Sequence, residues 1–155
     1  MNAARAGARG TTDRRRAREL AVQLLYQREV SGFEINALTG MFWDQAEEVA
    51  EEASEELLSP AARAYAERLA AGTAAHLADI DAHIESAGAT WRLARMNVVD
   101  RIVLRLAVYE LRHEPDLPAG VVINEALELA RTFSGEESVR FVNGVLDAVK
   151  RGEQA

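Results

Sequence analysis

The chain has no cysteine, only three prolines among its 155 residues, and few aromatic residues, which make up 6% of the sequence. Without cysteine it forms no disulfide and offers neither a thiolate metal site nor a cysteine nucleophile. No apolar run approaches the ~18 residues of a membrane span, and no apolar segment follows the N-terminal arginines as it would in a signal peptide. We therefore expect a cytoplasmic protein without membrane contact, long enough to bury one proper core.

Motifs that carry enzyme chemistry are missing as well. The sequence has no phosphate-cradling glycine loop, no nucleophile elbow and no Ser/His/Asp set that can be proposed from its spacing. His76, Asp79 and His83 share one helical face and could together touch a metal ion. The chain has only three histidines and neither paired-cysteine nor H-E-x-x-H spacing, so these residues are weak candidates for a metal site. These absences predict a binding protein with no catalytic residues, no metal and no cofactor.

Positive charge is concentrated at one end of the chain. The formal net charge is −7, whereas residues 1–18 hold six arginines and one aspartate, a net +5, so the remainder carries −12. A basic arm on an acidic body is a sign of nucleic-acid binding, although a solvated tail gives the same count. Residues 1–12 show no apolar periodicity, and we expect them to form a disordered basic arm.

The rest of the chain repeats apolar residues at helical spacing, and no segment alternates as a strand would. We expect an all-α fold of about seven helices over residues 13–150. Its N-terminal lobe spans about 13–85 and its C-terminal lobe about 90–150. The hub is a helix that starts at the N-cap Asn97, because this helix is apolar on almost every side and other helices must surround it. Asp100 lies three residues after the N-cap, where its carboxylate is expected to reach back to the unpaired backbone amides in a variant of the capping box.

Further local expectations follow from turn and cap residues and from apolar spacing. A long helix with Ser59 as N-cap is expected to run past Tyr65 and Ile80 and to stop before Gly88, and residues 90–96 are expected to form a short helical piece that leads into the hub. Residues 134–137 have the order of a capping box for the last helix, whose core-facing residues are expected to be Val142, Val145, Leu146 and Val149. The acidic run at 44–56 either frays into a solvated loop or serves as a counter-surface for the basic arm.

The first predicted helix begins near residue 12 or 13 and is expected to stop at Ser31 and Gly32. It breaks a local rule. Three arginines occupy its first turn, where the positive end of the helix dipole makes each cation unfavourable by a few tenths of a kcal/mol. A rule broken without visible compensation marks a functional site, and RNA phosphates would compensate. A tyrosine and a glutamine lie in line with the arginines, and single-stranded RNA is read by stacking and hydrogen bonding. The candidates for RNA binding are Arg14, Arg15, Arg16, Arg18, Gln23 and Tyr26; a solvated basic helix end is the alternative.

Four segments of the chain carry a family resemblance. They are RRRARELAVQLLY at 14–26 and, later in the chain, LRLAVYEL at 104–111, VINEALELA at 122–130 and FVNGVLD at 141–147. With these segments the chain resembles the bacterial transcription antitermination factor NusB family. The first segment is similar to the family's arginine-rich N-terminal helix, and the other three, which make the longer and more specific match, follow one another at the family's intervals.

The resemblance implies a NusB-like fold of two small helical bundles and a role in transcribing ribosomal RNA operons. Family members pair with a small-subunit ribosomal protein, NusE, and bind boxA RNA within the RNA polymerase antitermination complex. The positions that match RNA contacts are Arg14, Arg15, Arg16, Gln23 and Tyr26. The positions that match the ribosomal-protein interface are Asp100, Phe133, Glu137 and Phe141. Phe133 is equally well explained by core packing.

Two other interpretations compete with this one. The first is a helical RNA-binding module that serves an rRNA-modifying enzyme, since rRNA methyltransferases can carry a NusB-like domain. The second is a structural helical homodimer without RNA, which would use Phe33, Phe42 and Trp43.

Overall fold

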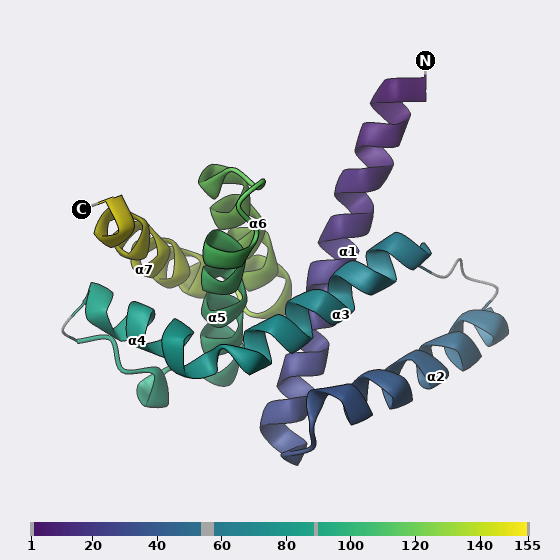
Figure 1. The fold of residues 1–155 in the computed structure, drawn as a ribbon, viewed down its shortest axis with the longest axis horizontal. Helices are drawn as coiled ribbons and strands as arrows, with labels where there is room; N and C mark the ends of the chain where they lie inside the picture. Colours follow the sequence, from purple (N-terminus) through teal and green to yellow (C-terminus); the bar gives the residue numbers. More distant parts are fainter. Residues whose placement is uncertain (1, 54–57, 89, 155) are drawn as a thin grey trace. The chain divides into compact units, whose positions relative to one another are not determined.

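The computed structural model is all-helical (Figure 1). It describes residues 2–53, 58–88 and 90–154, with side chains described in 13–48, 58–88 and 90–152. Within these residues there are seven α-helices, one short 3-10 helix and no strand, so the all-α expectation is confirmed. The chain divides into two compact units, Met1–Ala71 and Gly72–Ala155.

The first unit contains α1 (Asn2–Ser31), α2 (Ile35–Ala53) and most of α3 (Pro60–Ala75). Helix α1 ends where predicted, because Gly32 adopts φ 73° and donates its N–H to the carbonyl of Arg28 at 2.9 Å. Positive φ is strained for other residues, so glycine is the natural stop. The described core of this unit consists of Ala17, Ala21, Val22, Leu24, Leu25, Ile35, Leu38, Trp43, Ala62, Tyr65, Ala66, Leu69 and Ala70.

The start of α1 differs from the prediction. The helix begins at Asn2, not near residue 12 or 13, and so runs through the segment predicted to be a disordered arm. Alanine and arginine have high intrinsic helix propensity, and no proline interrupts the segment. The three arginines at 14–16 therefore lie inside the helix and not in its first turn, so the predicted conflict with the helix dipole is wrong.

The helix predicted to run from Ser59 to Gly88 is two helices, which corrects the sequence interpretation. Ser59 is its N-cap, since its Oγ accepts the backbone N–H of Ala62 at 3.1 Å. Helix α3 then ends at Ala75, and α4 (Leu77–Ala87) starts after His76, whose φ of −114° and ψ of 22° interrupt the helical ladder. The boundary between the two compact units falls within α3, so α4 belongs to the second unit. The sequence had placed this segment in the N-terminal lobe.

The ring of Tyr109 explains why α3 has glycine, and no larger residue, at position 72. A Cβ built on Gly72 lies 2.3 Å from Cζ and 2.4 Å from Oη of Tyr109. The ring of Tyr109 is 7% exposed and stacks on His113 with centroids 5.0 Å apart, so it has little room to withdraw. The ring therefore requires glycine at this position.

We expect Gly72→Ala to lower the free energy of unfolding by about 1–3 kcal/mol, the usual cost of overpacking. Urea denaturation measures it. Gly144→Ala is the matched control, because a Cβ there meets nothing within 4 Å and alanine raises helix propensity by up to about 1 kcal/mol. Equal stability changes in the two variants would contradict the steric explanation.

The second unit is built around α5 (Val98–His113), the helix predicted as the hub. It packs against α4, α6 (Ala119–Phe133) and α7 (Glu136–Gln154). Figure 1 shows α5 enclosed by these three helices. Nine of its residues are buried, as expected for a helix that is apolar nearly all round. The predicted core stripe of α7 is also confirmed: Val142, Val145 and Leu146 are fully buried and Val149 is 3% exposed.

The polar stripe of α5 fastens the helix to its neighbours. Arg105 donates to both carboxylate oxygens of Asp81 at 2.8 and 2.9 Å, and the pair is mostly buried. Arg101 donates to the carbonyl of Leu93 at 3.2 Å, and Leu93 lies in the 3-10 helix η1 (Leu93–Arg95). These contacts fix the segment before α5 in place.

The start of α7 corrects the predicted capping box. The helix begins at Glu136, so the residue before it is Gly135 and not Ser134. Ser134 instead closes α6 as its C-cap, and its Oγ lies 2.7 Å from the hydroxyl of Ser138. The loop between α6 and α7 is too short to leave Ser134 free for a separate N-cap.

The acidic run is helical over its first part, because α2 continues to Ala53; residues 54–57 lie outside the described part of the chain. Glu47 pairs with Arg63 at 3.4 Å, across an exposed surface of the first unit. None of the described helices combines the length and the apolar character that crossing a bilayer requires.

Candidate nucleic-acid interface and protein-binding pocket

Five of the six residues predicted to bind RNA are exposed on α1. Four of them share an arc of about 100°, and Arg14 lies beside the buried face of the helix, near Tyr65. The side chains of Arg14, Arg15, Arg16 and Gln23 are exposed, and Tyr26 is 46% exposed. The opposite face of the same helix packs into the core of the first unit through Ala17, Ala21 and Leu24. Cations, an amide and an aromatic ring are thus displayed together on a helix whose other side is fixed.

Arg18, the sixth candidate, is not on this surface. Its side chain is 2% exposed, lies 5.7 Å from the ring centroid of Tyr65 and donates to the Tyr65 hydroxyl at 3.5 Å. A guanidinium buried in this way is not available to a phosphate on the surface, so the structure places Arg18 in the packing of the first unit and not among the exposed candidates. The sequence grouped Arg18 with the neighbouring arginines because the charges cluster there, and clustering does not reveal burial.

Tyr65 organises the basic end of α1, and sequence reasoning treated it only as a residue of the α3 stripe. Its ring is 8% exposed. It is approached by the guanidinium carbons of Arg14 at 5.9 Å and of Arg68 at 5.0 Å, in addition to Arg18. Cations over an aromatic face are attracted by its quadrupole. The ring therefore holds several like charges near one another at the edge of the exposed face.

The aromatic residues proposed for a structural dimer do not form one surface. Phe33 is 58% exposed, but Trp43 is 6% exposed and donates its indole N–H to Glu67 at 2.6 Å. Phe42 meets Trp43 edge-on, with centroids 5.3 Å apart. The pair belongs to the packing of α2 on α3, which leaves Phe33 as the exposed member.

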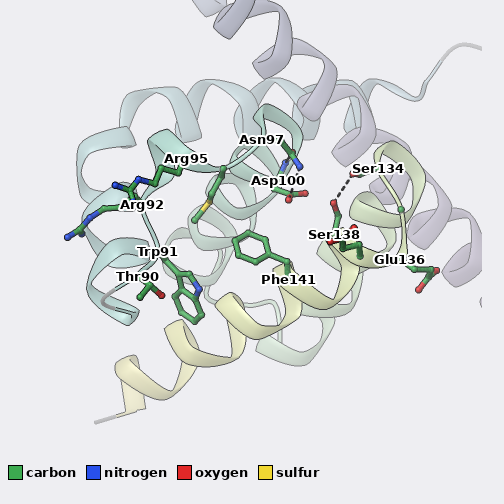
Figure 2. Close-up of a pocket in the computed structure, with 13 residues that line it drawn as sticks. Thr90, Trp91, Arg92, Arg95, Asn97, Asp100, Ser134, Glu136, Ser138 and Phe141 are labelled. Carbon is green, nitrogen blue, oxygen red and sulfur yellow. Dashed lines mark hydrogen bonds between the residues drawn. The ribbon is translucent and has the colours of Figure 1, made fainter.

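A pocket of about 680 Å³ lies in the second unit, between the segment before α5 and the N-terminus of α7. Figure 2 shows Phe141 in its middle, Arg92 and Arg95 to one side, and Ser138 and Glu136 to the other. The volume is within the usual range for ligand sites. The residues that line the pocket are Thr90, Trp91, Arg92, Arg95, Met96, Asn97, Asp100, Ser134, Gly135, Glu136, Glu137, Ser138 and Phe141.

Three of the four residues predicted at a protein interface meet in this pocket. They are Asp100, Glu137 and Phe141, which come from two helices distant in sequence. Phe141 is half-buried and Glu137 is exposed. Phe133 is half-buried at the end of α6 and does not line the pocket, so the structure does not group it with the other three.

Asp100 is held at the pocket wall by the cap of α5. Asn97 accepts the backbone N–H of Asp100 at 2.8 Å and donates its side-chain amide to Oδ2 of Asp100 at 3.0 Å. The reciprocal bond therefore runs between side chains, whereas the sequence anticipated a carboxylate reaching back to backbone amides. The other oxygen, Oδ1, is buried and has no hydrogen-bond partner, in a residue that is 6% exposed.

The third carboxylate at this end of the pocket is already paired. Arg131 donates to Glu136 at 2.8 Å and also pairs with Glu128. The hydrogen bond to Glu136 and the charges of Glu136 and Glu128 raise the pKa of Arg131 above its ordinary value. Glu136 is thus engaged on the outer rim, and Asp100 and Glu137 supply the negative charge inside.

The basic side of the pocket was not anticipated from the sequence. Residues 90–96 were interpreted only as a short helical piece leading into the hub, and η1 confirms such a piece. Arg92 is the N-cap of η1, Arg95 is its last residue, and both are exposed. The signal that could have found them is the density of arginine and tryptophan just before a strong N-cap.

The histidines considered as metal ligands are used elsewhere. His76 lies against His113 with ring centroids 4.3 Å apart, and its Nδ1 is 2.8 Å from the carbonyl of Gly72. His83 Nδ1 is 2.9 Å from the carbonyl of Asp79. Over the described part of the chain, no three or more potential ligands are grouped so as to hold a metal ion.

A basic, partly aromatic helix face and an open polar pocket, both on an all-helical scaffold, are the surfaces of a helical binding protein. Comparison with known proteins identifies which one. The NusB family pattern matches residues 15–151, and the chain belongs to this family of transcription antitermination proteins, which are not enzymes.

Similar proteins cover nearly the whole chain. The transcription antitermination protein NusB of Anaeromyxobacter sp. (strain Fw109-5) is 47% identical over 139 residues, 90% of each chain. That of Myxococcus xanthus (strain DK1622) is 44% identical over 136 residues, 88% of this chain and 93% of that protein.

Solved structures agree in fold. T. maritima NusB superposes with a TM-score of 0.73 at 36% identity, covering 89% of this chain and 90% of that one. A chain from a crystal structure of antitermination factors NusB and NusE in complex with double-stranded RNA also gives a TM-score of 0.73, at 29% identity, covering 91% of this chain and 98% of that one.

Proposed function

We propose that this protein binds boxA RNA of ribosomal RNA operons together with the ribosomal protein NusE, as part of the RNA polymerase antitermination complex in the cytoplasm. The observation that carries the RNA part is the exposure of Arg14, Arg15, Arg16, Gln23 and Tyr26 along α1. Guanidinium groups hold phosphates, while tyrosine and glutamine read unstacked bases.

The NusE part rests on the pocket in the second unit. It brings together Asp100, Glu137 and Phe141, residues matched to a protein interface on sequence grounds alone. Interfaces are anchored by aromatic side chains in pockets with a few well-placed polar groups. A similar chain has been crystallised with NusE and RNA, which supports the same pair of ligands here.

The deciding experiment is a gel shift with a boxA-containing RNA, in the presence and absence of NusE, with a scrambled RNA as control. We expect a shift that strengthens when NusE is added. If the protein binds neither the boxA-containing RNA nor the scrambled RNA, and does not bind NusE, it is better explained as a structural protein. Sedimentation of the protein alone tests the homodimer, for which Phe33 is the exposed apolar contact.

Tyr26→Ala is expected to cost about 1–3 kcal/mol of RNA affinity, the contribution of one stacked base. The ring is 46% exposed, so thermal stability should change little. Fluorescence anisotropy with labelled RNA gives the affinity, and circular dichroism gives the melting temperature. Tyr26→Phe serves as control, since it keeps the stacking face; equal losses in both variants would mean that the hydroxyl and not the ring makes the contact.

A further inference from the structure

The pocket of the second unit is electrically two-sided. Asp100 and Glu137 lie at the α5 and α7 end, whereas Arg92 and Arg95 lie at the η1 end. In Figure 2 the labelled aromatic ring of Phe141 separates Arg92 and Arg95 from Ser138 and Glu136. A polar site with opposite charges at its two ends distinguishes the two directions in which a chain can enter it.

Asp100 is the feature that points to a ligand. The residue is 6% exposed, and its Oδ1 atom is buried without a hydrogen-bond partner. Leaving a buried carboxylate oxygen unpaired costs more than an ordinary missing hydrogen bond. The side-chain amide of Asn97 holds the other carboxylate oxygen, Oδ2, so Oδ1 is the acceptor left for a donor that enters the pocket.

We infer that the pocket accepts one extended segment of the protein partner in a single direction. A lysine or arginine of that segment approaches Asp100 and Glu137, an apolar side chain rests on Phe141, and a carboxylate approaches Arg92 and Arg95. This inference rests on the proposed function, because it takes the pocket to be the NusE site. It adds the chemistry and the direction of the bound segment.

The reverse direction is excluded by electrostatics. It would place a cation beside two arginines and a carboxylate beside the unpaired Asp100 oxygen. Like charges brought together at an interface repel each other, and such repulsion is how one binding mode is selected over another. Arg92 and Arg95 therefore determine orientation, while Asp100 contributes to affinity.

The first test is the affinity of NusE for charge variants. Asp100→Asn keeps the size of the side chain and its capping acceptor, and we expect it to weaken binding about tenfold or more. Arg92→Glu with Arg95→Glu should weaken it by a similar factor. The matched control is Arg140→Glu with Arg151→Glu, two exposed arginines of α7 outside the pocket, which changes the net charge equally and should alter affinity by less than about threefold.

The second test reads direction, and the absence of cysteine makes it clean. A nitroxide is attached to Thr90→Cys at the basic end or to Gly135→Cys at the acidic end, where a Cβ meets nothing within 4 Å. Paramagnetic broadening of isotope-labelled NusE is then recorded by NMR. The label at 135 should broaden the NMR signals of a stretch of NusE residues that contains Lys or Arg. The label at 90 should broaden the signals of a neighbouring stretch that contains Asp or Glu. A label at Arg151→Cys, outside the pocket, should broaden neither stretch.

The outcomes separate the two claims. The proposed orientation would be overturned if the label at 135 broadened acidic NusE residues and the label at 90 broadened basic ones. It would also be overturned if the charge variants bound NusE as tightly as the control variant does. Neither result would contradict NusE binding itself. Failure of the unaltered protein to bind NusE would overturn the proposed partner and this inference together. Because Asp100 also touches the cap of α5, melting curves accompany its variant, and the arginine pair keeps the test decisive if Asp100→Asn unfolds.

Discussion

Replacing Arg14, Arg15 and Arg16 with alanine is expected to weaken RNA binding severely and to flatten its salt dependence. Each phosphate contact that is lost lowers the log–log slope by about 0.7 for single-stranded RNA, so three contacts lower it by about 2. All three side chains are exposed, and because α1 begins at Asn2 they lie inside the helix, where the helix dipole has little effect on a charge. Folding should therefore survive, with a melting temperature near that of the unaltered protein.

The control for this variant removes the same amount of charge elsewhere. Arg140, Lys150 and Arg151 all lie on α7, and their triple alanine variant should leave the slope nearly unchanged. Anisotropy titrations at four or more salt concentrations give both slopes. Similar slopes in the two triple variants would show that net charge, and not the α1 face, attracts the RNA.

Phe141→Asp is expected to abolish NusE binding while the fold remains. Phe141 is half-buried, at the centre of the pocket, whereas its neighbour Val142 is fully buried. An aromatic anchor in a pocket is a frequent hot spot, with losses of 2 kcal/mol or more on truncation. An added carboxylate beside Asp100 and Glu137 makes the pocket more negative and removes its apolar centre.

A pull-down and a circular-dichroism melt together decide this prediction. If Phe141 served the core instead, loss of the ring alone would cost about 3–5 kcal/mol, and the protein would unfold. Phe33→Asp is the matched control, because Phe33 is 58% exposed and belongs to the other unit. A Phe141 variant that melts normally and still binds NusE would remove the pocket from the interface.

The features that were predicted correctly from the sequence are local ones. The hub helix, the core stripe of α7, the stop at Gly32 and the N-cap at Ser59 were all expected, and the structure has them. Caps and stripes depend on residues within a few positions of one another, so a single chain carries their signal. The exposure of Tyr26 was predictable for the same reason.

What the sequence did not predict depends on contacts between distant residues. Helix α3 ends near His76, shortly after Gly72, where the missing side chain leaves room for the ring of Tyr109. The burial of Arg18 requires Tyr65, which lies 47 positions away. The basic side of the pocket forms because Arg101 fixes Leu93 before the hub. None of these partners is visible in local periodicity.

The burial of Arg18 bears on the thermodynamics of the proposed RNA complex. Because Arg18 and Tyr65 join α1 to α3 beneath the exposed arginines, the described part of the RNA-facing helix is already ordered before any ligand arrives. Arginine-rich segments that fold on binding spend interaction energy on ordering their backbone. Here that entropy was lost when the protein folded, so preorganisation leaves more of the phosphate attraction to appear as affinity.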